Sequence, residues 1–348
     1  MNLLHGVGDF FSLDIGTNSM RIVQLTGGSQ HGWTLQKFAY IPIDQKLTQD
    51  SSELGKKRLG EAIMGAVEQA GIKTKNVALG LPANKTFTSI VETDTLPEKE
   101  LVKTFKYEMD KYIPMAASEA KADYIILGPS PNDPAKTEVL ISSVAKEYAE
   151  STMEIIEKTG LNIVAMEPEP LAAARSLTPP GAIDATMIVD FGENSADIVI
   201  VYKNQPRLVR SVPGGFSTLV RAVATGLNVR EDQARQFILK FGLDERQVEG
   251  QVFRILNTHL DNFASELAKS VRFFQTKYIN GKVGGIVLSG YAGMIPLFTE
   301  FIEAKTNVST IKGNPWQLVR TTSAQQQALM SVASEFAVAI GLSERSND

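Results

Sequence analysis

Apolar and polar positions follow the same order in two distant stretches of the chain. Near the start, an apolar run ends in Asp14-Ile15-Gly16, small polar residues follow, and a second apolar run begins at Met20. In mid-chain, the run Met187–Val189 ends in Asp190-Phe191-Gly192, and a second run begins at Ala196. Apolar runs that flank a turn rich in Gly, Asn and Ser predict a β-hairpin in each place. Asp-x-Gly alone is common in ordinary hairpin turns, so the repetition is what suggests a shared function.

Between and after these hairpins, the pattern predicts strands that alternate with helices. Short apolar runs mark the strands, and apolar positions at helical spacing mark the helices. The predicted strands cover residues 77–82, 86–91, 123–127, 138–144, 162–166, 208–212 and 285–288. The predicted helices cover residues 49–71, 97–112, 145–159, 217–225, 231–241, 248–278, 295–306 and 325–340. Alternation of this kind in two similar halves predicts an α/β protein with duplicated lobes.

Turn-forming segments divide the chain into three parts. Residues 1–95 are predicted to form a first lobe, which residues 167–180 complete. Residues 96–166 are predicted to form an inserted α/β subdomain, and residues 181–348 a second lobe. The hinge between the lobes is Thr178-Pro179-Pro180-Gly181, a run that favours a loop. A length of 348 residues suits two lobes better than one simple domain.

Composition excludes several classes of function. A formal net charge of −4 gives no basic surface for nucleic acid. The absence of cysteine excludes disulfides, thiolate metal sites and thiol catalysis, and three histidines without His-x-x-x-His spacing argue against a histidine metal centre. No apolar run approaches the roughly 20 residues of a transmembrane helix, and no secretory signal is evident. We therefore expect a cytoplasmic location.

Each predicted hairpin carries residues suited to phosphate binding. Its turn exposes amides and side-chain donors that can surround an anion, while its aspartate can hold a hydrated cation. The candidate phosphate-binding residues of the first hairpin are Asp14, Gly16, Thr17, Asn18, Ser19 and Arg21. Those of the second are Asp190, Gly192, Asn194 and Ser195. Asp14 and Asp190 are the candidate residues for Mg²⁺, bound through water. In the structural alternative, the same residues are simply good turn formers.

A candidate catalytic carboxylate lies just before the hinge, in Glu167-Pro168-Glu169. The structural interpretation is a helix N-terminus, where the helix dipole favours a carboxylate. In the functional interpretation one of the two glutamates, for which Glu169 is the candidate, polarises an attacking water. Phosphoryl transfer depends mainly on positioning and on metal electrostatics, so one such carboxylate completes the minimum set.

These motifs together resemble the actin-like ATPase superfamily, which includes bacterial actins, heat-shock chaperone ATPases, sugar kinases and FtsA. The resemblance rests on Asp14-Ile15-Gly16-Thr17, on a second Asp-x-Gly after the Glu-Pro-Leu-Ala-Ala-Ala stretch at 169–174, and on the Ser289-Gly290 turn. Within the superfamily, the chain resembles the PilM family of cytoplasmic type IV pilus assembly proteins over nearly its whole length. Tyr112-Ile113-Pro114, before the inserted strands, is the segment most specific to that family.

The resemblance implies an actin-like ATPase fold, with two RNase H-like lobes and an inserted FtsA/PilM-type subdomain. It implies that the hairpins are the two phosphate loops for ATP, with Asp14 and Asp190 arranging Mg²⁺ and with Glu169 positioning a water. The implied nucleoside side comprises Gly214, Gly215, Arg235, Ser289, Gly290 and Tyr291. Any ATP hydrolysis is expected to be slow or absent, because nothing beyond Glu169 suggests an efficient base.

The resemblance also implies partners. Proteins of this family dock the cytoplasmic tail of a PilN-like inner-membrane protein and contact other pilus assembly components. We therefore expect a scaffold held at the inner face of the cytoplasmic membrane through its partners, with no nucleic acid and with self-association left open.

Several positions depart from the superfamily pattern. Gly290-Tyr291-Ala292 stands where related proteins usually have Gly-Gly-Gly. Arg235 and Ile238 fall near positions at which FtsA-like proteins present Glu and Lys to the nucleoside. These departures predict an altered nucleoside side with both phosphate loops retained.

Two other functions remain open. One is an FtsA- or MreB-like filament-forming ATPase, which sedimentation with ATP would reveal; the inserted subdomain and the polar tail at 341–348 favour a scaffold instead. The other is a small-molecule kinase, which would need a catalytic aspartate in the first lobe. No convincing candidate for that aspartate stands out, and phosphorylation of a sugar or carboxylate panel would be the test.

Overall fold

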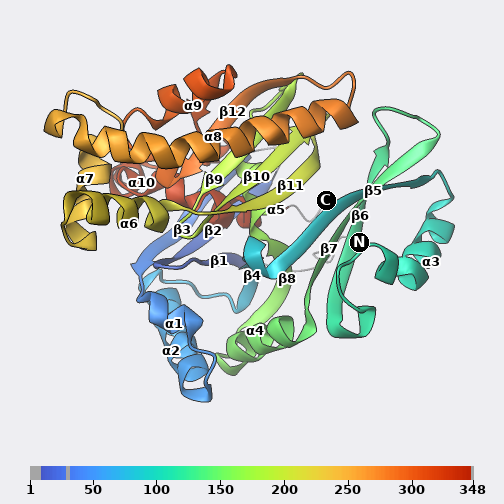
Figure 1. Ribbon diagram of the computed structural model, residues 1–348. Helices are drawn as coiled ribbons and strands as arrows, with labels where there is room; N and C mark the ends of the chain where they lie inside the picture. The colour runs from blue at the N-terminus through green and yellow to red at the C-terminus, as the bar shows by residue number, and fades with distance from the viewer. Residues whose placement is uncertain (1–8, 29–31, 346–348) are drawn as a thin grey trace. The chain divides into compact units, whose positions relative to one another are not determined.

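The computed structural model describes residues 9–28 and 32–345, which fold into two compact units (Figure 1). The first unit contains the described residues up to Ser176, together with residues 316–332 and 338–345. The second contains residues 177–315 and 333–337. None of the helices in the described part of the chain combines the length and apolarity needed to cross a membrane.

A six-stranded sheet forms the centre of the first unit, in the order β14-β3-β2-β1-β4-β8. The first three strands of the chain pair antiparallel, and the sheet continues with parallel pairs between β1 and β4 and between β4 and β8. Its strands are β1 (Phe11–Ile15), β2 (Ser19–Gly28), β3 (Gly32–Pro42), β4 (Asn76–Leu81), β8 (Asn162–Pro168) and β14 (Val319–Arg320). The helices of this unit outside the small sheet are α1 (Gln45–Gln49), α2 (Glu53–Gln69), α4 (Lys146–Lys158), α5 (Glu169–Leu177), α10 (Ser323–Leu329) and α11 (Ala337–Ser343).

Helices α2 and α4 cover this sheet with their apolar faces. Ile63 and Val67 of α2 and Ile156 of α4 pack in one cluster with Phe11 and Leu13 of β1. Spacing of three or four residues places Ile63 and Val67 on the same side of α2. Burial of this apolar face is the main source of the stability of these two helices.

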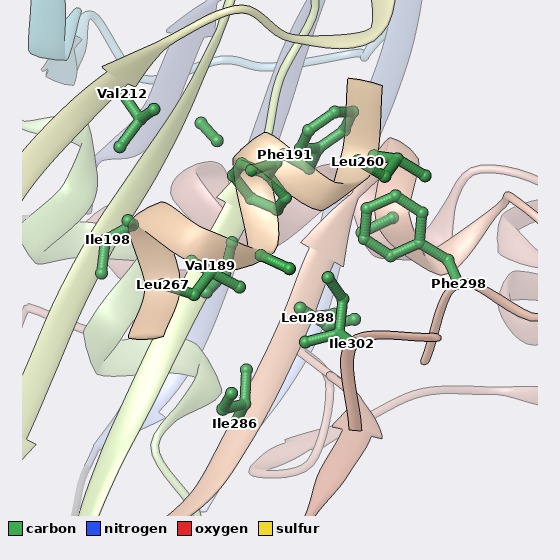
Figure 2. Packing of buried hydrophobic residues seen from close by; sticks show 14 of the residues in the cluster. Val189, Phe191, Ile198, Val212, Leu260, Leu267, Ile286, Leu288, Phe298 and Ile302 are labelled. Atoms are coloured by element: carbon green, nitrogen blue, oxygen red, sulfur yellow. The ribbon is translucent and has the colours of Figure 1, made fainter. Parts of the chain in front are cut away.

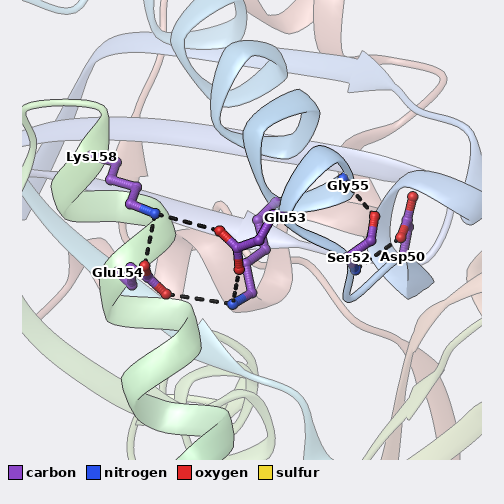
Figure 3. Close-up of polar contacts among 7 residues, drawn as sticks. Asp50, Ser52, Glu53, Gly55, Glu154 and Lys158 are labelled. Atoms are coloured by element: carbon purple, nitrogen blue, oxygen red, sulfur yellow. Dashed lines mark hydrogen bonds and ion pairs between the residues drawn. The ribbon is translucent and has the colours of Figure 1, made fainter.

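The exposed sides of α2 and α4 meet in a ring of ion pairs, shown in Figure 3. Lys56 lies 2.9 Å from Glu53 and 3.5 Å from Glu154, and Lys158 lies 2.7 Å from Glu154. Most of these side chains are solvent-exposed, so water screens the attractions and they add little stability. Ser52 has a clearer role, because its hydroxyl accepts a hydrogen bond from the Gly55 amide at 3.0 Å and caps the first turn of α2.

A separate three-stranded antiparallel sheet also belongs to the first unit, in the order β5-β7-β6. Its strands are β5 (Thr86–Asp94), β6 (Ala120–Pro129) and β7 (Lys136–Ala145). On one face, Val139 and Ile141 of β7 pack with Leu101 and Phe105 of α3 (Glu98–Glu108). The opposite face carries the alternate residues of the same strands and borders a groove described below.

The second unit repeats the arrangement of the large sheet, with the order β11-β10-β9-β12-β13. An antiparallel meander is again followed by two parallel neighbours, as in β3-β2-β1-β4-β8. Its strands are β9 (Ala185–Phe191), β10 (Ser195–Tyr202), β11 (Gln205–Pro213), β12 (Val283–Gly290) and β13 (Thr310–Lys312). Its helices are α6 (Phe216–Leu227), α7 (Glu231–Phe241), α8 (Gln251–Lys277) and α9 (Phe298–Thr306).

The core of the second unit lies between this sheet and helices α8 and α9 (Figure 2). Val189 and Phe191 point to the same side of β9 and meet Leu260 and Leu267 from α8. Phe191 also contacts Phe298 of α9, with ring centroids 5.4 Å apart. This packing fixes the end of β9, from which the second Asp-x-Gly turn projects.

The predicted α/β class is confirmed, and most predicted elements are found within a few residues of their expected bounds. The expected helix at 325–340 is wrong, because three short segments replace it: α10, a 3₁₀ turn at Ala333–Phe336, and α11. The 3₁₀ turn belongs to the second unit, where Phe336 is fully buried, while α10 and most of α11 belong to the first. The chain passes from the first unit to the second and back within residues 325–340, and tertiary packing there overrides the helical pattern of the sequence.

The expected domain bounds also differ from the observed groupings. The small sheet begins with β5, before residue 96, whereas β8 of the expected insertion lies in the six-stranded sheet. β14 also joins the six-stranded sheet, although residues 181–348 were all expected in the second lobe. Strand pairing brings β14 beside β3, a contact that local sequence patterns do not encode.

Candidate functional site

The first Asp-x-Gly turn joins β1 and β2 in the first unit. The Gly16 amide donates a hydrogen bond to the Ser19 carbonyl at 3.0 Å, which closes the turn around Thr17 and Asn18. The Asn18 carbonyl accepts from the Ile43 amide at 2.9 Å, so the neighbouring strand end holds the turn from outside. Ser19 is buried, whereas Gly16, Thr17 and Asn18 are partly exposed. The predicted residues of this turn are therefore together, and its tip can meet a ligand.

Asp14 and Arg21 face each other across the base of this turn. They are cross-strand neighbours, and Arg21 Nη1 lies 2.9 Å from Asp14 Oδ2. A Cβ atom on Gly16 would lie only 2.7 Å from Arg21 Nη1, so glycine gives the guanidinium the space to lie beside the turn. Burial leaves the Asp14 side chain only 4% exposed. The turn therefore combines a buried carboxylate, a cation and exposed backbone in one place.

Glu169 lies near the same edge of the sheet. It begins α5, directly after β8, and β8, β4 and β1 run parallel, so their carboxyl ends share one edge. A Cβ atom on Gly80 of β4 would lie 3.1 Å from Glu169 Cγ, so Glu169 packs directly over the β4 backbone. Burial raises the pKa of Tyr148, and the nearby charge of Glu169 raises it further. The first unit thus brings Glu169 to the sheet edge at which Asp14 lies.

Glu167, the other glutamate of this segment, has a structural role. It is buried, and its carboxylate accepts hydrogen bonds from Arg175 at 2.5 and 3.1 Å and from Arg345 at 2.7 Å. Burial alone would raise the pKa of Glu167, but the charges of Arg175 and Arg345 hold it below the usual value. Two guanidinium groups thus neutralise Glu167, which leaves Glu169 as the candidate for chemistry.

The second Asp-x-Gly turn joins β9 and β10 in the second unit. The Gly192 amide donates to the Ser195 carbonyl at 2.9 Å, as Gly16 does to Ser19 in the first turn. The Gly214 amide donates to the Asn194 carbonyl at 3.1 Å. A Cβ atom on Gly215 would lie 2.8 Å from the Glu193 carbonyl carbon, so glycine there allows close packing against the turn. The two turns are therefore alike in their hydrogen bonding.

Gly290 supports this turn from the neighbouring strand. β12 runs parallel to β9, with Ser289 beside Asp190 and Gly290 beside Phe191. Gly290 has φ +64°, and a Cβ atom there would lie 2.7 Å from Asp190 Oδ1. The Ser289 hydroxyl donates to the Ser334 carbonyl at 2.9 Å and anchors the strand end. The structure therefore gathers Ser289 and Gly290 beside Asp190.

Asp197 is a carboxylate at this turn that the sequence analysis did not select. It lies directly opposite Asp190 in the β9–β10 ladder, and burial raises its pKa to about 6. Its Oδ1 atom is buried without a hydrogen-bond partner among the described residues. The signal was present in the sequence, because a residue seven positions after Asp190 returns opposite it across a tight hairpin. Asp190 and Asp197 therefore lie opposite each other in the β9–β10 ladder and place two carboxyl groups at the base of this turn.

Arg235 and Tyr291, two of the expected nucleoside residues, contact Phe216 and Glu193. The Tyr291 and Phe216 rings are stacked, with centroids 4.2 Å apart and planes 8° apart. The Arg235 guanidinium lies over the Phe216 ring, 4.8 Å from its centroid, and forms a two-pronged ion pair with Glu193 at 2.5 and 3.2 Å. An aromatic pair adds about 1 kcal/mol beyond its buried area, and a cation over a ring adds a similar amount. We call these four residues the Arg235 cluster.

Mg²⁺ fits the carboxylates found at the turns. In residues 9–28 and 32–345, no group of three or more His, Cys, Asp or Glu side chains is arranged to hold a metal ion directly. Mg²⁺ usually keeps several waters and uses only one or two carboxylates, with phosphate oxygens as further ligands. Asp14 in one unit, and Asp190 with Asp197 in the other, match that donor chemistry.

A groove of about 420 Å³ lies within the first unit, on the open face of the three-stranded sheet. Apolar side chains on its surface include Ile125, Leu140, Met153, Met166 and Leu171. Arg345, which is bound to Glu167, also lines it. β6, at one edge of the sheet, has no second strand partner among the described residues. The groove therefore offers an apolar floor beside an unpaired strand edge.

Comparison with known proteins places the chain among pilus proteins. A family model described as type IV pilus assembly protein PilM matches residues 12–347.

Solved structures share the fold at low sequence identity. A PilM–PilN type IV pilus biogenesis complex matches with a TM-score of 0.79 and 20% identity, over 97% of this chain and 98% of the other. MreB5 of Spiroplasma citri bound to AMPPNP matches with a TM-score of 0.53 and 11% identity, over 96% and 95%. A non-polymerising MamK mutant bound to AMPPNP matches with a TM-score of 0.51 and 9% identity, over 98% and 99%. The expected actin-like ATPase fold is thereby confirmed.

Proposed function

Because the chain belongs to the type IV pilus assembly protein PilM family, we propose that it is an ATP-binding scaffold that docks the cytoplasmic tail of a PilN-like inner-membrane protein. That partner holds it at the inner face of the cytoplasmic membrane, beside other pilus assembly components. The PilM–PilN complex of the same fold supports this choice of partner. The groove in the first unit is the observation that carries the docking function.

The groove suits an extended apolar segment. Ile125 of β6 and Leu140 of β7 are cross-strand neighbours and present apolar surface from the sheet. Met153 and Met166 line the groove from α4 and β8, and flexible methionine side chains adapt to irregular ligands. An extended peptide can also pair with the edge of β6 through main-chain hydrogen bonds. An N-terminal tail that emerges from a membrane anchor can supply such a segment.

ATP binding rests on the two turns. Gly16 in the first turn and Gly192 in the second allow close approach of a phosphate to the backbone, and Thr17, Asn18, Ser19, Asn194 and Ser195 add donors. In each unit the aspartates at the turn, Asp14 in the first and Asp190 with Asp197 in the second, would hold Mg²⁺ through its waters, which would supply positive charge beside the phosphates. The AMPPNP-bound MreB5 and MamK structures of the same fold support a nucleotide ligand.

Hydrolysis is assigned to Glu169 alone. A carboxylate at the N-terminus of α5 accepts a hydrogen bond from water and orients it toward a phosphate. No second base is assigned, so turnover is slow or absent, and nucleotide occupancy regulates partner binding instead.

Nucleotide binding can be tested by titrating the protein with labelled ATP and Mg²⁺. We expect saturable binding that Asp14→Ala weakens at least tenfold, since the turn loses its cation-holding carboxylate. Asp94→Ala is the matched control, because Asp94 is an exposed aspartate of the same unit that pairs with Lys136 on the surface. Absence of binding by the wild type, or equal binding by both variants, would refute the ATP function.

Docking can be tested separately with a peptide of the cytoplasmic tail of the PilN-like protein from the same organism. Ile125→Glu places a charge in the groove and should weaken peptide binding at least tenfold. Ile311→Glu is the matched control, because Ile125 and Ile311 are 54% and 53% exposed and both lie on strands. Ile311 lies on β13 of the second unit and should tolerate the charge. Equal effects of the two substitutions would exclude the groove.

A further inference from the structure

The Arg235 cluster places three planar groups beside the second turn. Tyr291 follows Gly290 at the carboxyl end of β12, next to Asp190 and Phe191 of β9. Ligands of open α/β sheets bind outside the carboxyl ends of parallel strands, so Tyr291 begins at the edge that would face a ligand. Its ring is parallel to the Phe216 ring, and the Arg235 guanidinium covers Phe216 further. Three planar groups therefore contact one another at this edge.

The polar atoms of the cluster are also engaged within it. Glu193, in the turn itself, receives both prongs of the Arg235 guanidinium, and Arg235 Nη1 lies 3.4 Å from the Tyr291 hydroxyl oxygen. The Glu193 side chain is only 7% exposed, so it points into the cluster and not toward the open side of the turn. One side chain, that of Glu193, therefore links the turn to the stack.

Recognition of a nucleobase needs the features that this cluster uses internally. A base is held by stacking on aromatic or guanidinium planes and is distinguished by hydrogen bonds to its edges. In this cluster the Tyr291 ring and the Arg235 guanidinium lie against the Phe216 ring, and Arg235 also contacts the Tyr291 hydroxyl group. A nucleoside attached to phosphates on the turn would meet a preformed stack instead of an open slot.

We infer that the Arg235 cluster takes the place of a nucleobase, so that this protein binds nucleotides through their phosphates and Mg²⁺ without distinguishing the base. This inference rests on the proposed nucleotide binding at the turns, and it names the ligand class as nucleoside triphosphates of any base.

The direct test compares ATP, GTP and CTP, each with Mg²⁺, by calorimetric titration of the wild-type protein. We expect dissociation constants within about threefold of each other, because the phosphates supply the binding free energy. A larger preference for ATP would overturn the inference and leave the proposed ATP function intact. Absence of binding by all three nucleotides would overturn both.

Variants test whether the cluster causes the lack of selectivity. Tyr291→Gly removes one plane of the stack and should produce a preference of about tenfold for ATP over CTP, because purines stack more strongly than pyrimidines. Arg230→Ala is the control, since Arg230 is an exposed arginine at the start of α7 that pairs with Asp232. It should leave the three affinities equal. Arg235→Ala removes the guanidinium from the same stack and should produce a similar preference. Equal affinities for the three nucleotides in both folded variants would overturn the inference.

Discussion

Arg21 donates a hydrogen bond to Asp14 across the β1–β2 hairpin, with Nη1 and Oδ2 2.9 Å apart and both side chains largely buried. The positive charge of the guanidinium thereby balances the negative charge of a carboxylate that is buried inside the first unit. A Mg²⁺ ion bound near Asp14 would compensate the same negative charge. The ion pair with Arg21 therefore stabilises the Asp14 carboxylate when no Mg²⁺ is bound.

Arg21→Ala should lower the free energy of unfolding by about 3 kcal/mol, because it leaves the Asp14 carboxylate buried without its cation. Urea denaturation measures this change. Arg58→Ala, at an exposed arginine on α2, serves as the control and should change stability little. Adding Asp14→Asn to Arg21→Ala should recover part of the loss, and fully additive effects would show that the two side chains do not interact.

Asp197 should make stability fall as pH rises. Its pKa is raised by burial from 3.8 to about 6, so between these values the folded protein holds a proton that the unfolded chain has lost. The contribution of Asp197 to stability is therefore largest below pH 4, decreases up to about pH 6 and is then level, with a total loss of about 3 kcal/mol from this group. Asp197→Asn should remove this dependence and stabilise the protein at pH 7. Thermal unfolding from pH 4 to 7 tests both points, and an unchanged slope in the variant would contradict them.

Glu167→Gln should destabilise the first unit, because Arg175 and Arg345 lose the carboxylate that balances their charges. The substitution leaves Arg175 and Arg345 beside a neutral group in a buried place, at an expected cost of about 3 kcal/mol at neutral pH. The pKa of Glu167 is lowered in the folded state, so its contribution is present above the usual value of 4.5 and is lost as pH falls. Denaturation of wild type and variant should therefore converge in acid. A constant difference at all pH values would contradict the ion-pair explanation.

Gly290→Ala should distort the end of β12. The position has φ +64°, and the added methyl group would lie 2.6 Å from the Phe191 carbonyl oxygen and 2.7 Å from Asp190 Oδ1. We expect a loss of about 2 to 3 kcal/mol in stability and weaker Mg²⁺-dependent nucleotide binding. Gly285→Ala in the same strand is the matched control, because the nearest atom, the Ser309 carbonyl oxygen, lies 3.7 Å away. Comparable losses in the two variants would point to a general effect of alanine in this strand.

Sequence patterns predicted the parts of this fold that depend on neighbours along the chain. The β1–β2 and β9–β10 hairpins were predicted because alternation and turn residues occupy adjacent positions. The same local logic led to Asp14, Asp190 and Glu169, since each follows or ends a predicted strand. Asp197 could have been added by extending the register of the second hairpin across the turn.

The features that sequence analysis missed depend on distant pairings. Glu193 and Arg235 are 42 positions apart, and their ion pair forms only when α7 packs beside the second turn. The sequence alone therefore showed Arg235 as a departure from the superfamily pattern but did not connect it with Glu193. The interruption of the expected helix at 325–340 has a similar origin, because Phe336 is buried in a unit different from that of α10.

Ser12 and Ser343 share a hydrogen bond of 2.8 Å, and Ser12 also donates to the Ala339 carbonyl at 2.6 Å. β1, which holds Ser12, thus receives contacts from residues that lie more than 300 positions further along the chain. While the ribosome still holds the segment around α11, the first unit lacks these contacts, whereas residues 185–312 can already form the sheet of the second unit. Chaperone binding to nascent chains should therefore persist on the first unit until α11 has left the ribosome, and chains truncated before α11 should be degraded even though their second sheet has formed.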